Sequence, residues 1–289
     1  MANLGIIFAL GALLCWSFGD FFIQKASRKT GIVHALFYIT AAASIVLLPF
    51  VWNDLKHLTT SEIYLLLGSG VVIFLVALIE FQALKIGKLA VVEPIMSLEL
   101  PLTVLIAGLI GHENLDLIDY GIIAVVFLGI FLTVTPHTGV LKDYIKRLEK
   151  GALLAFISAA GMALFNFMLG YSSQETSPLM AHWATSLVMA TGCLLFMMKS
   201  GEVRRVVADF KKATLPIIAE TIFDNGAWIF YAFAVIYVPI SIAITISESY
   251  IIVAVLLGVI INREKLKHHQ YFGVILAIGG VLLLSYLSS

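Results

Sequence analysis

The sequence predicts an all-α membrane protein with ten transmembrane helices, arranged as two inverted five-helix repeats. The first observation behind this fold class is composition: 61% of the 289 residues are hydrophobic, 12% are charged and the mean hydropathy is +1.02. Soluble domains carry roughly 25% charged residues. A composition this apolar excludes soluble enzymes and nucleic-acid-binding proteins, so the lipid bilayer is the expected environment.

The second observation is the number of long apolar stretches. A helix that crosses the hydrocarbon core needs about 20 mostly apolar residues, because the core is about 30 Å thick and each residue rises about 1.5 Å. Ten stretches meet this requirement, at residues 4–24, 31–51, 62–84, 89–111, 117–135, 151–172, 178–198, 214–235, 239–261 and 270–287.

Local signals support several of these boundaries. Proline suits the first position of a helix, and glycine or polar pairs suit the breaks between helices. Helix starts are expected at Ser177-Pro178 and Pro239, breaks at Asn53-Asp54 and Pro136, and segment openings at Gly31 and Gly151.

The third observation is the placement of basic residues, which concentrate in short cytoplasmic loops. With ten spans, the loops after helices 1, 3, 5, 7 and 9 hold all of the 18 Lys and Arg except Lys56. This predicts a multi-pass protein of a prokaryotic plasma membrane with both termini extracytoplasmic. Residues 139–150 carry Leu141, Tyr144, Ile145 and Leu148 among basic residues. This pattern predicts a cytoplasmic amphipathic linker that contacts anionic lipid.

The two halves of the chain match weakly. One constant shift pairs Asp20 with Asn166 and Ser27 with Ser173, and a slightly longer one pairs Glu113 with Glu264. Because each half holds an odd number of helices, equivalent loops face opposite sides of the membrane, which makes the repeats inverted. The expected organisation is a first repeat at 1–138, the linker at 139–150 and a second repeat at 151–289.

The chain resembles the ten-helix, EamA-type members of the drug/metabolite transporter superfamily. The segments that carry the resemblance are Phe81-Gln82-Ala83-Leu84-Lys85, Ser97-Leu98-Glu99-Leu100-Pro101, His112-Glu113-Asn114-Leu115, Asn262-Arg263-Glu264-Lys265-Leu266 and the glycine-bearing run 272–284. The resemblance implies a central cavity formed by helices 3, 4, 8 and 9 and closed by helices 1 and 6. It also implies cytoplasmic termini. The distribution of basic residues indicates the opposite, and we therefore predict that both termini are extracytoplasmic.

Seven of the 18 acidic residues lie four or more residues inside the expected spans, where none of the basic residues lies; these acids are Asp20, Glu80, Glu93, Glu99, Glu220, Asp224 and Glu248. An ionised acid at the bilayer centre costs about 2.5 to 3.5 kcal/mol on insertion scales. Glu80 and Glu93 lie near helix ends and are expected to reach the headgroups. Glu99, Asp224 and Glu248 lie near midpoints, so a cavity, a proton or a cation must accommodate them.

Aromatic side chains share helix faces with these acids, because residues three or four apart stack along one side. An aromatic ring beside a carboxylate suits an organic cation, although the rings could equally fill space. The predicted substrate-binding and coupling residues are Glu99, Asp224, Glu248, Asp20, Trp16, Trp228, Tyr231, Tyr250 and Asn166. His34 and His182 are expected to be hydrogen-bonded packing residues.

The leading functional hypothesis is a secondary transporter that moves a small organic metabolite or drug by alternating access. A cation or zwitterion is favoured, with a proton or another ion as the coupling partner, because an anionic phosphate would need Arg or Lys in the cavity. The alternative is a cation channel or a divalent-metal facilitator. No catalytic motif, cofactor, resident metal or nucleic-acid partner is expected, and a homodimer is left open.

Overall fold

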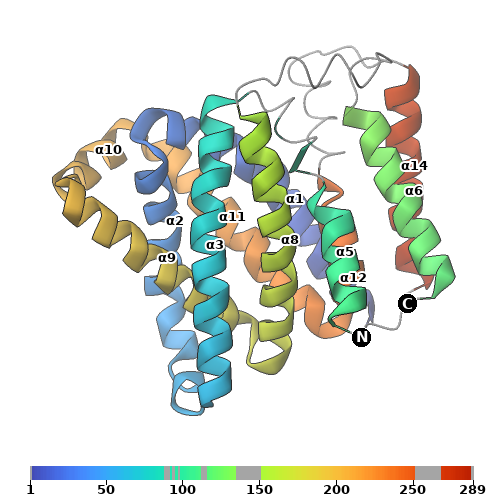
Figure 1. Ribbon diagram of the computed structural model, residues 1–289, viewed down its shortest axis with the longest axis horizontal. Helices are drawn as coiled ribbons and strands as arrows, with labels where there is room; N and C mark the ends of the chain where they lie inside the picture. Colours follow the sequence, from blue (N-terminus) through green and yellow to red (C-terminus); the bar gives the residue numbers. More distant parts are fainter. Residues whose placement is uncertain are drawn as a thin grey trace.

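The computed structural model describes residues 2–87, 92, 95–96, 98–111, 116–134, 151–250 and 268–287. Within these ranges every regular element is a helix, as Figure 1 shows. The predicted amphipathic linker at 139–150 lies outside the described residues, as does the second half of the span expected at 239–261.

The first half of the chain supplies five α-helices and one 3₁₀ turn to the described structure. They are α1 (Ala2–Thr30), α2 (Ile32–Val51), η1 (Asp54–Lys56), α3 (Thr60–Ile86), α5 (Glu99–Leu109) and α6 (Leu117–Val134). Three of them are long enough and apolar enough to cross a membrane, namely α1, α2 and α3.

The second half supplies α8 (Ala152–Glu175), α9 (Pro178–Ser200), η2 (Val203–Arg205), α10 (Val206–Lys212), α11 (Thr214–Tyr237), α12 (Ile240–Ser247) and α14 (His268–Leu287). Two more candidate spans lie here, in α8 and α9, which makes five among the described residues. The sequence did not predict α10, which forms a short helix inside the basic loop between residues 198 and 214.

Side-chain and glycine caps explain where several helices begin and end. Ser177 accepts a hydrogen bond from the backbone N–H of Met180, and Pro178 occupies the first turn of α9. Gly31 and Gly151 adopt φ angles of 94° and 93°, which favour glycine, and they precede α2 and α8. The predicted starts at these three positions are confirmed, and so is the break after Val51 at Asn53-Asp54.

Helix contacts in the bundle come in matching pairs across the two halves. By position in its half, α8 is the equivalent of α1, α11 of α3, and α12 of α5. In the first half α1 contacts α11 and α12, and in the second half α8 contacts α3 and α5. The contacts α2·α9, α5·α12 and α6·α14 each join equivalent helices of the two halves. The pairing is that of a pseudo-two-fold arrangement, and the α6·α14 pair lies at one edge in Figure 1.

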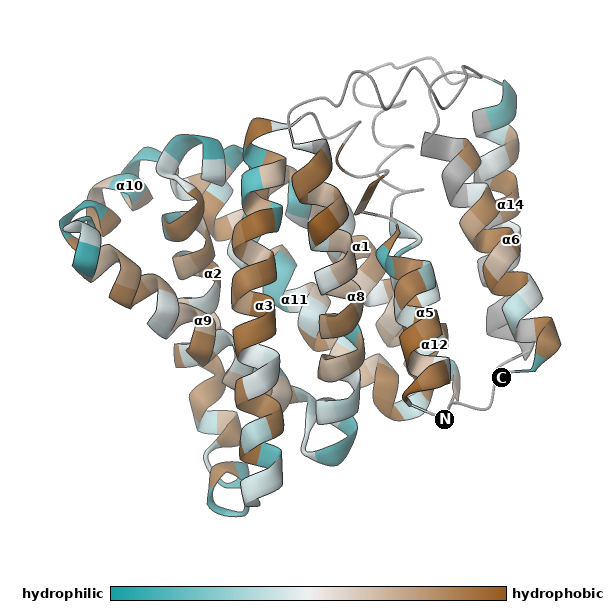
Figure 2. Cartoon of the chain, in the orientation of Figure 1, coloured by the Kyte–Doolittle hydropathy of each residue, from teal (hydrophilic) through white to brown (hydrophobic). Residues whose placement is uncertain are grey.

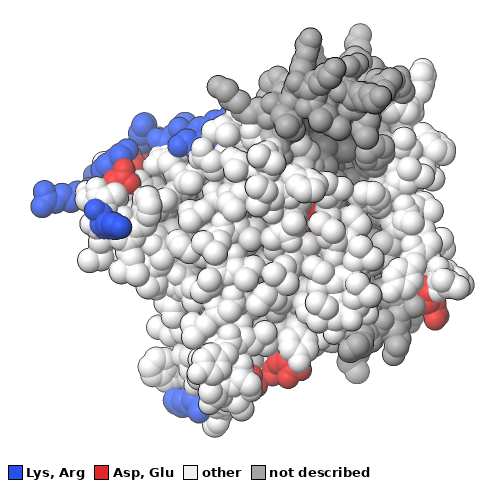
Figure 3. All heavy atoms as spheres, viewed as in Figure 1, with Lys and Arg blue, Asp and Glu red and all other residues white. Residues whose placement is uncertain are grey.

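The outer surface is apolar and the two ends of the bundle differ in charge. Brown, hydrophobic residues cover the sides of the helices in Figure 2, and large apolar side chains such as Leu109, Ile45 and Leu215 are strongly exposed. A surface of this kind suits lipid tails. Figure 3 shows most basic side chains of this face gathered at one end, the basic end. Both termini lie toward the opposite end in Figure 1.

Candidate substrate cavity

A cavity lies in the middle of the bundle. Its walls come from α1, α2, α3, α5, α8, α9 and α11, together with Glu248 and Tyr250 just after α12. Its volume accessible to water is about 50 Å³. A few water molecules fill such a space, whereas the pockets that hold drug-sized ligands measure about 300 to 1,000 Å³. As described, the cavity is too small for a drug-sized ligand.

The cavity brings together eight of the nine residues that the sequence predicted for substrate binding and coupling. They are Trp16, Asp20, Glu99, Asn166, Asp224, Trp228, Glu248 and Tyr250. Tyr231 instead lies one layer behind the wall. It is fully buried, its hydroxyl donates to the backbone carbonyl of Asn166 at 3.0 Å, and its ring lies 6.2 Å from that of Trp228.

Two of the cavity acids meet at the ends of their helices. Glu99 occupies the first turn of α5, and Glu248 follows Ser247 at the end of α12. Both side chains are buried and hydrogen-bonded to each other. Two carboxyl groups can share a hydrogen bond only when one of them carries a proton, because an ionised carboxylate is an acceptor only. The hydrogen bond between the two side chains therefore requires one proton for the pair.

The other two central acids each accept a hydrogen bond from an aromatic residue. The hydroxyl of Tyr250 donates to Asp20, and the indole N–H of Trp228 donates to Asp224 one turn before it on α11. Asp20 and Asp224 also lie within electrostatic range of each other. Both acids line the same cavity.

Aromatic rings form a continuous wall beside these acids. The ring of Trp228 lies 4.9 Å from that of Trp16 and 5.1 Å from that of Phe165, both in edge-to-face geometry. Tyr250 continues the wall, with its ring 6.4 Å from that of Trp16. Edge-to-face packing fixes these rings, so their faces and the carboxylates are presented together. This geometry suits a positively charged organic group.

Several cavity residues were missed or misplaced by the sequence argument. Glu80 was expected to reach lipid headgroups, but it lines the cavity from α3, which corrects that expectation. His182 and Asn225 also line it and hydrogen-bond to each other at 2.9 Å. His182 thus is the hydrogen-bonded histidine that the sequence predicted, although it faces the cavity. Glu93, predicted alongside Glu80, lies outside the described residues.

In the part of the chain that the structure describes, all Asp, Glu, Lys and Arg side chains that line the cavity are acidic. Five carboxyl groups line it, and the described lining includes neither Lys nor Arg. Among the described residues, no group of three or more His, Cys, Asp and Glu side chains is arranged to hold a metal ion. The site therefore presents acidic groups, hydrogen-bonding groups and aromatic rings to whatever enters.

Comparison with known proteins identifies the fold and the family. No curated protein sequence matches the chain. Chains of solved structures do match, 28 in all, and one with a crystal structure aligns with a TM-score of 0.68 at 15% identity, covering 98% of each chain. At that identity the likeness shows the fold alone. A family model, described as the EamA-like transporter family, matches residues 3–135 and again 149–286. The chain belongs to this family, and it is a multi-pass membrane transporter of the drug/metabolite superfamily.

Proposed function

We propose that the protein is a secondary active transporter that moves a small organic cation or zwitterion by alternating access, in exchange for protons. The observation that carries this proposal is the convergence of Asp20, Glu80, Glu99, Asp224 and Glu248 on one cavity, without Lys or Arg in its described lining. Acids buried in this way need a positive partner. A proton and a cationic substrate can both supply it.

Competition between these two partners is sufficient for coupling. The Glu99 and Glu248 pair already requires a proton, and the carboxylates of Asp20 and Asp224 face the aromatic wall. If cation binding displaces a proton, each ligand lowers the affinity for the other by the same factor. If the transporter changes conformation only when its site holds a proton or a cation, it must exchange protons for cations.

The proposal extends to the architecture of ten transmembrane helices in two inverted repeats, at residues 1–138 and 151–289. The paired contacts between equivalent helices support a pseudo-two-fold relation between the halves. The acids in the first turn of α5 and at the end of α12 support it as well. Discontinuous helices at the repeat interface are a recurring way to build a transport site near the bilayer midplane.

We further propose that the basic end of the bundle is cytoplasmic and that both termini are extracytoplasmic. The support is the concentration of Lys and Arg at one end (Figure 3), where the end of α1 and the segment of η2 and α10 carry them. Lys in short loops marks the cytoplasmic face. Lys56, the last residue of η1, is the exception at the other end.

A cation channel or divalent-metal facilitator is the alternative, and counterflow separates it from a carrier. Unlabelled substrate trapped inside a vesicle accelerates the uptake of labelled substrate by a carrier, since the loaded site returns faster than the empty one. A channel shows no such acceleration. Acceleration by an organic cation, and not by Mn²⁺, is the result that the proposal expects.

Proteoliposomes loaded with a pH-sensitive dye test the proposal directly. A panel of organic cations is added, including tetraethylammonium, which is permanently charged and carries no proton of its own. The expected result is proton efflux from the vesicles with at least one member of the panel. The matched control is Asp54→Asn, which changes an exposed acid of η1 outside the cavity lining and should behave as wild type. The proposal fails if substrates move saturably while the internal pH stays constant.

A further inference from the structure

Glu220 is a buried acid that the cavity does not use. It lies on α11 one turn before Asp224, is fully buried, and is outside the cavity lining. Both of its carboxyl oxygens are buried without a hydrogen-bond partner. An ionised carboxylate in such a place lacks both water and donors and is strongly disfavoured. Glu220 therefore holds a proton in this conformation, and its O–H points at no acceptor.

His34 is a second buried group with one unpartnered atom. On α2, its Nδ1 lies 2.7 Å from Oδ2 of Asp209 on α10. If Nδ1 carries the hydrogen and donates it to the carboxylate, Nε2 is left as an acceptor. Nε2 is buried and has no hydrogen-bond partner. An unpartnered proton donor on α11 and an unpartnered acceptor on α2 are chemically complementary.

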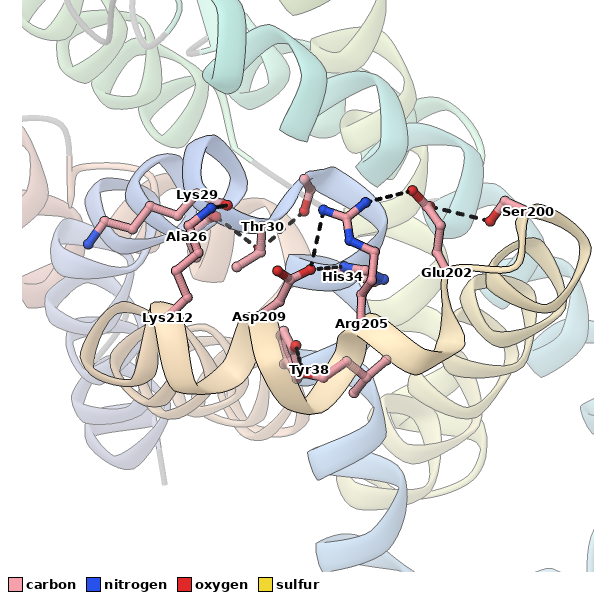
Figure 4. A network of polar contacts seen from close by, with 12 residues as sticks. Ala26, Lys29, Thr30, His34, Tyr38, Ser200, Glu202, Arg205, Asp209 and Lys212 are labelled. Atoms are coloured by element: carbon pink, nitrogen blue, oxygen red, sulfur yellow. Dashed lines mark hydrogen bonds and ion pairs between the residues drawn. The ribbon is translucent and has the colours of Figure 1, made fainter.

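The polar network around His34 reaches the surface at the basic end, as Figure 4 shows. Asp209 contacts both His34 and Arg205, whose Nη2 lies 3.8 Å from its Oδ2. The Arg205 side chain is 57% exposed, whereas those of Asp209 and His34 are 8% and 3% exposed. Exposure thus falls step by step from solvent to His34.

The register between α2 and α11 places Glu220 and His34 at the same depth. Both helices begin at the basic end, so they run parallel, and they are in contact. The side-chain amide of Asn225 donates to the backbone carbonyl of Ile39 at 3.1 Å, which fixes their relative height. Glu220 and His34 each lie five residues earlier, about 7.5 Å closer to the basic end. Tyr38, also on α2, is in electrostatic range of Asp209 and Glu220.

We propose that Asp209, His34 and Glu220 form the route by which protons pass between the basic end of the protein and Asp224 in the cavity. Glu220 gives its proton to Nε2 of His34, and Nδ1 passes its own proton to the Asp209 carboxylate, 2.7 Å away, which releases it to solvent beside Arg205. A flip of the imidazole ring then restores the hydrogen on Nδ1 and the acceptor at Nε2. Glu220 is then reprotonated from Asp224, one turn further along α11. The charged and titratable groups that face this route are Asp224 and Asp20 near the cavity, Tyr38 beside it and Arg205 at its mouth. The proposal rests on the proton coupling proposed above.

Infrared spectroscopy of the protein in nanodiscs tests the route without a substrate. The spectrum of Glu220→Gln, subtracted from that of wild type at neutral pH, should contain the carbonyl band of a protonated carboxyl group. Glu202→Gln removes an exposed acid at the same end and should remove no such band. In D₂O, the shift of the Glu220 band should be slower by about tenfold in His34→Gln, which retains Glu220. An absent band, or equal exchange rates in wild type and His34→Gln, overturns the proposal.

Transport measurements separate a failure of the route from a failure of the proposed function. In dye-loaded proteoliposomes driven by tetraethylammonium, Glu220→Gln and His34→Gln should slow proton movement by about tenfold. Exchange of labelled for unlabelled tetraethylammonium should stay within about twofold of wild type. If wild type moves protons and neither variant slows them, the route is wrong and the function stands. If wild type moves no protons with any cation, the proposed function fails, and the infrared result still decides whether Glu220 exchanges its proton through His34.

Discussion

Glu99 and Glu248 hydrogen-bond to each other across the cavity, one from the first turn of α5 and the other from the end of α12. The two residues are far apart in the chain, and each lies at an end of its helix. Their hydrogen bond requires one proton for two carboxyl groups. The pair therefore changes its charge when it exchanges that proton for a cation, and this property motivates the first prediction.

Replacing either member of the pair with glutamine should flatten the pH dependence of transport. In wild type, cation affinity should rise with pH, because a cation need not displace a proton that has already left. In Glu99→Gln or Glu248→Gln the slope of log affinity against pH should fall by about one. The amide still donates a hydrogen bond to the remaining carboxylate, so thermal stability should change by no more than about 1 kcal/mol. Unchanged slopes in both variants would show that the pair does not couple protons to transport.

The aromatic wall should contribute to cation affinity. Trp228→Leu removes a ring that packs on Trp16 and Phe165 and faces the carboxylates. The expected loss is about 0.5 to 2 kcal/mol of binding free energy for a quaternary ammonium ion, measured by calorimetry at fixed pH. Trp52→Leu, an exposed tryptophan after α2, serves as the matched control. If Trp228→Leu and wild type bind the cation with equal affinity, the aromatic wall does not contribute to cation binding.

Gly161 should be required for close packing of α8 on α3. A Cβ at this position would lie 2.4 Å from Cγ2 of Val76, which forces the helices apart. Gly161→Ala should cost about 1 to 3 kcal/mol of stability, seen as a lower melting temperature in detergent. Gly68 lies in the same interface, and the nearest atom to its added Cβ, in Met168, is 3.7 Å away. Gly68→Ala should therefore be neutral, and equal melting of the two variants would contradict this account of the interface.

The orientation in the membrane can be tested with single cysteines. In a background where Cys15 and Cys193 are replaced by alanine, His57→Cys and Lys211→Cys place exposed thiols at opposite ends of the bundle. A membrane-impermeant maleimide added to intact cells should label the first variant, and the second only after permeabilisation. The physical reason is the retention of basic loops on the cytoplasmic side. The reverse labelling pattern would place the termini in the cytoplasm.

Hydropathy and helical periodicity were sufficient to predict eight of the residues that line the cavity. Asp20, Asp224 and Trp228 could be found because acids are rare in membrane spans and because residues four apart share a helix face. Glu80 was misplaced, since its distance from the end of the span suggested the interface. Its actual position depends on how α3 is rotated against α8 and α9, and a single helix carries no information about its neighbours' rotation.

The distance of a side chain from the cavity surface could not be predicted from the sequence either. Tyr231 shares a face with Trp228, yet its hydroxyl reaches the backbone of Asn166 and its ring lies behind the cavity. Periodicity assigns a direction to a side chain and leaves the distance to the cavity open. The pairing of His34 with Asp209 depends on α10, a helix too short to produce an apolar pattern of its own. Only the folded arrangement shows these partners.

The most direct test of the account is the number of protons released when a cation binds. Calorimetric titration of the purified protein with a cation selected by thermal shift, repeated in buffers of different ionisation enthalpy, measures this number. We predict release of about one proton per cation in wild type, and markedly less in Glu248→Gln. Binding that releases no proton at any pH, or equal release by wild type and Glu248→Gln, would contradict the claim that protons and cations compete for these acids.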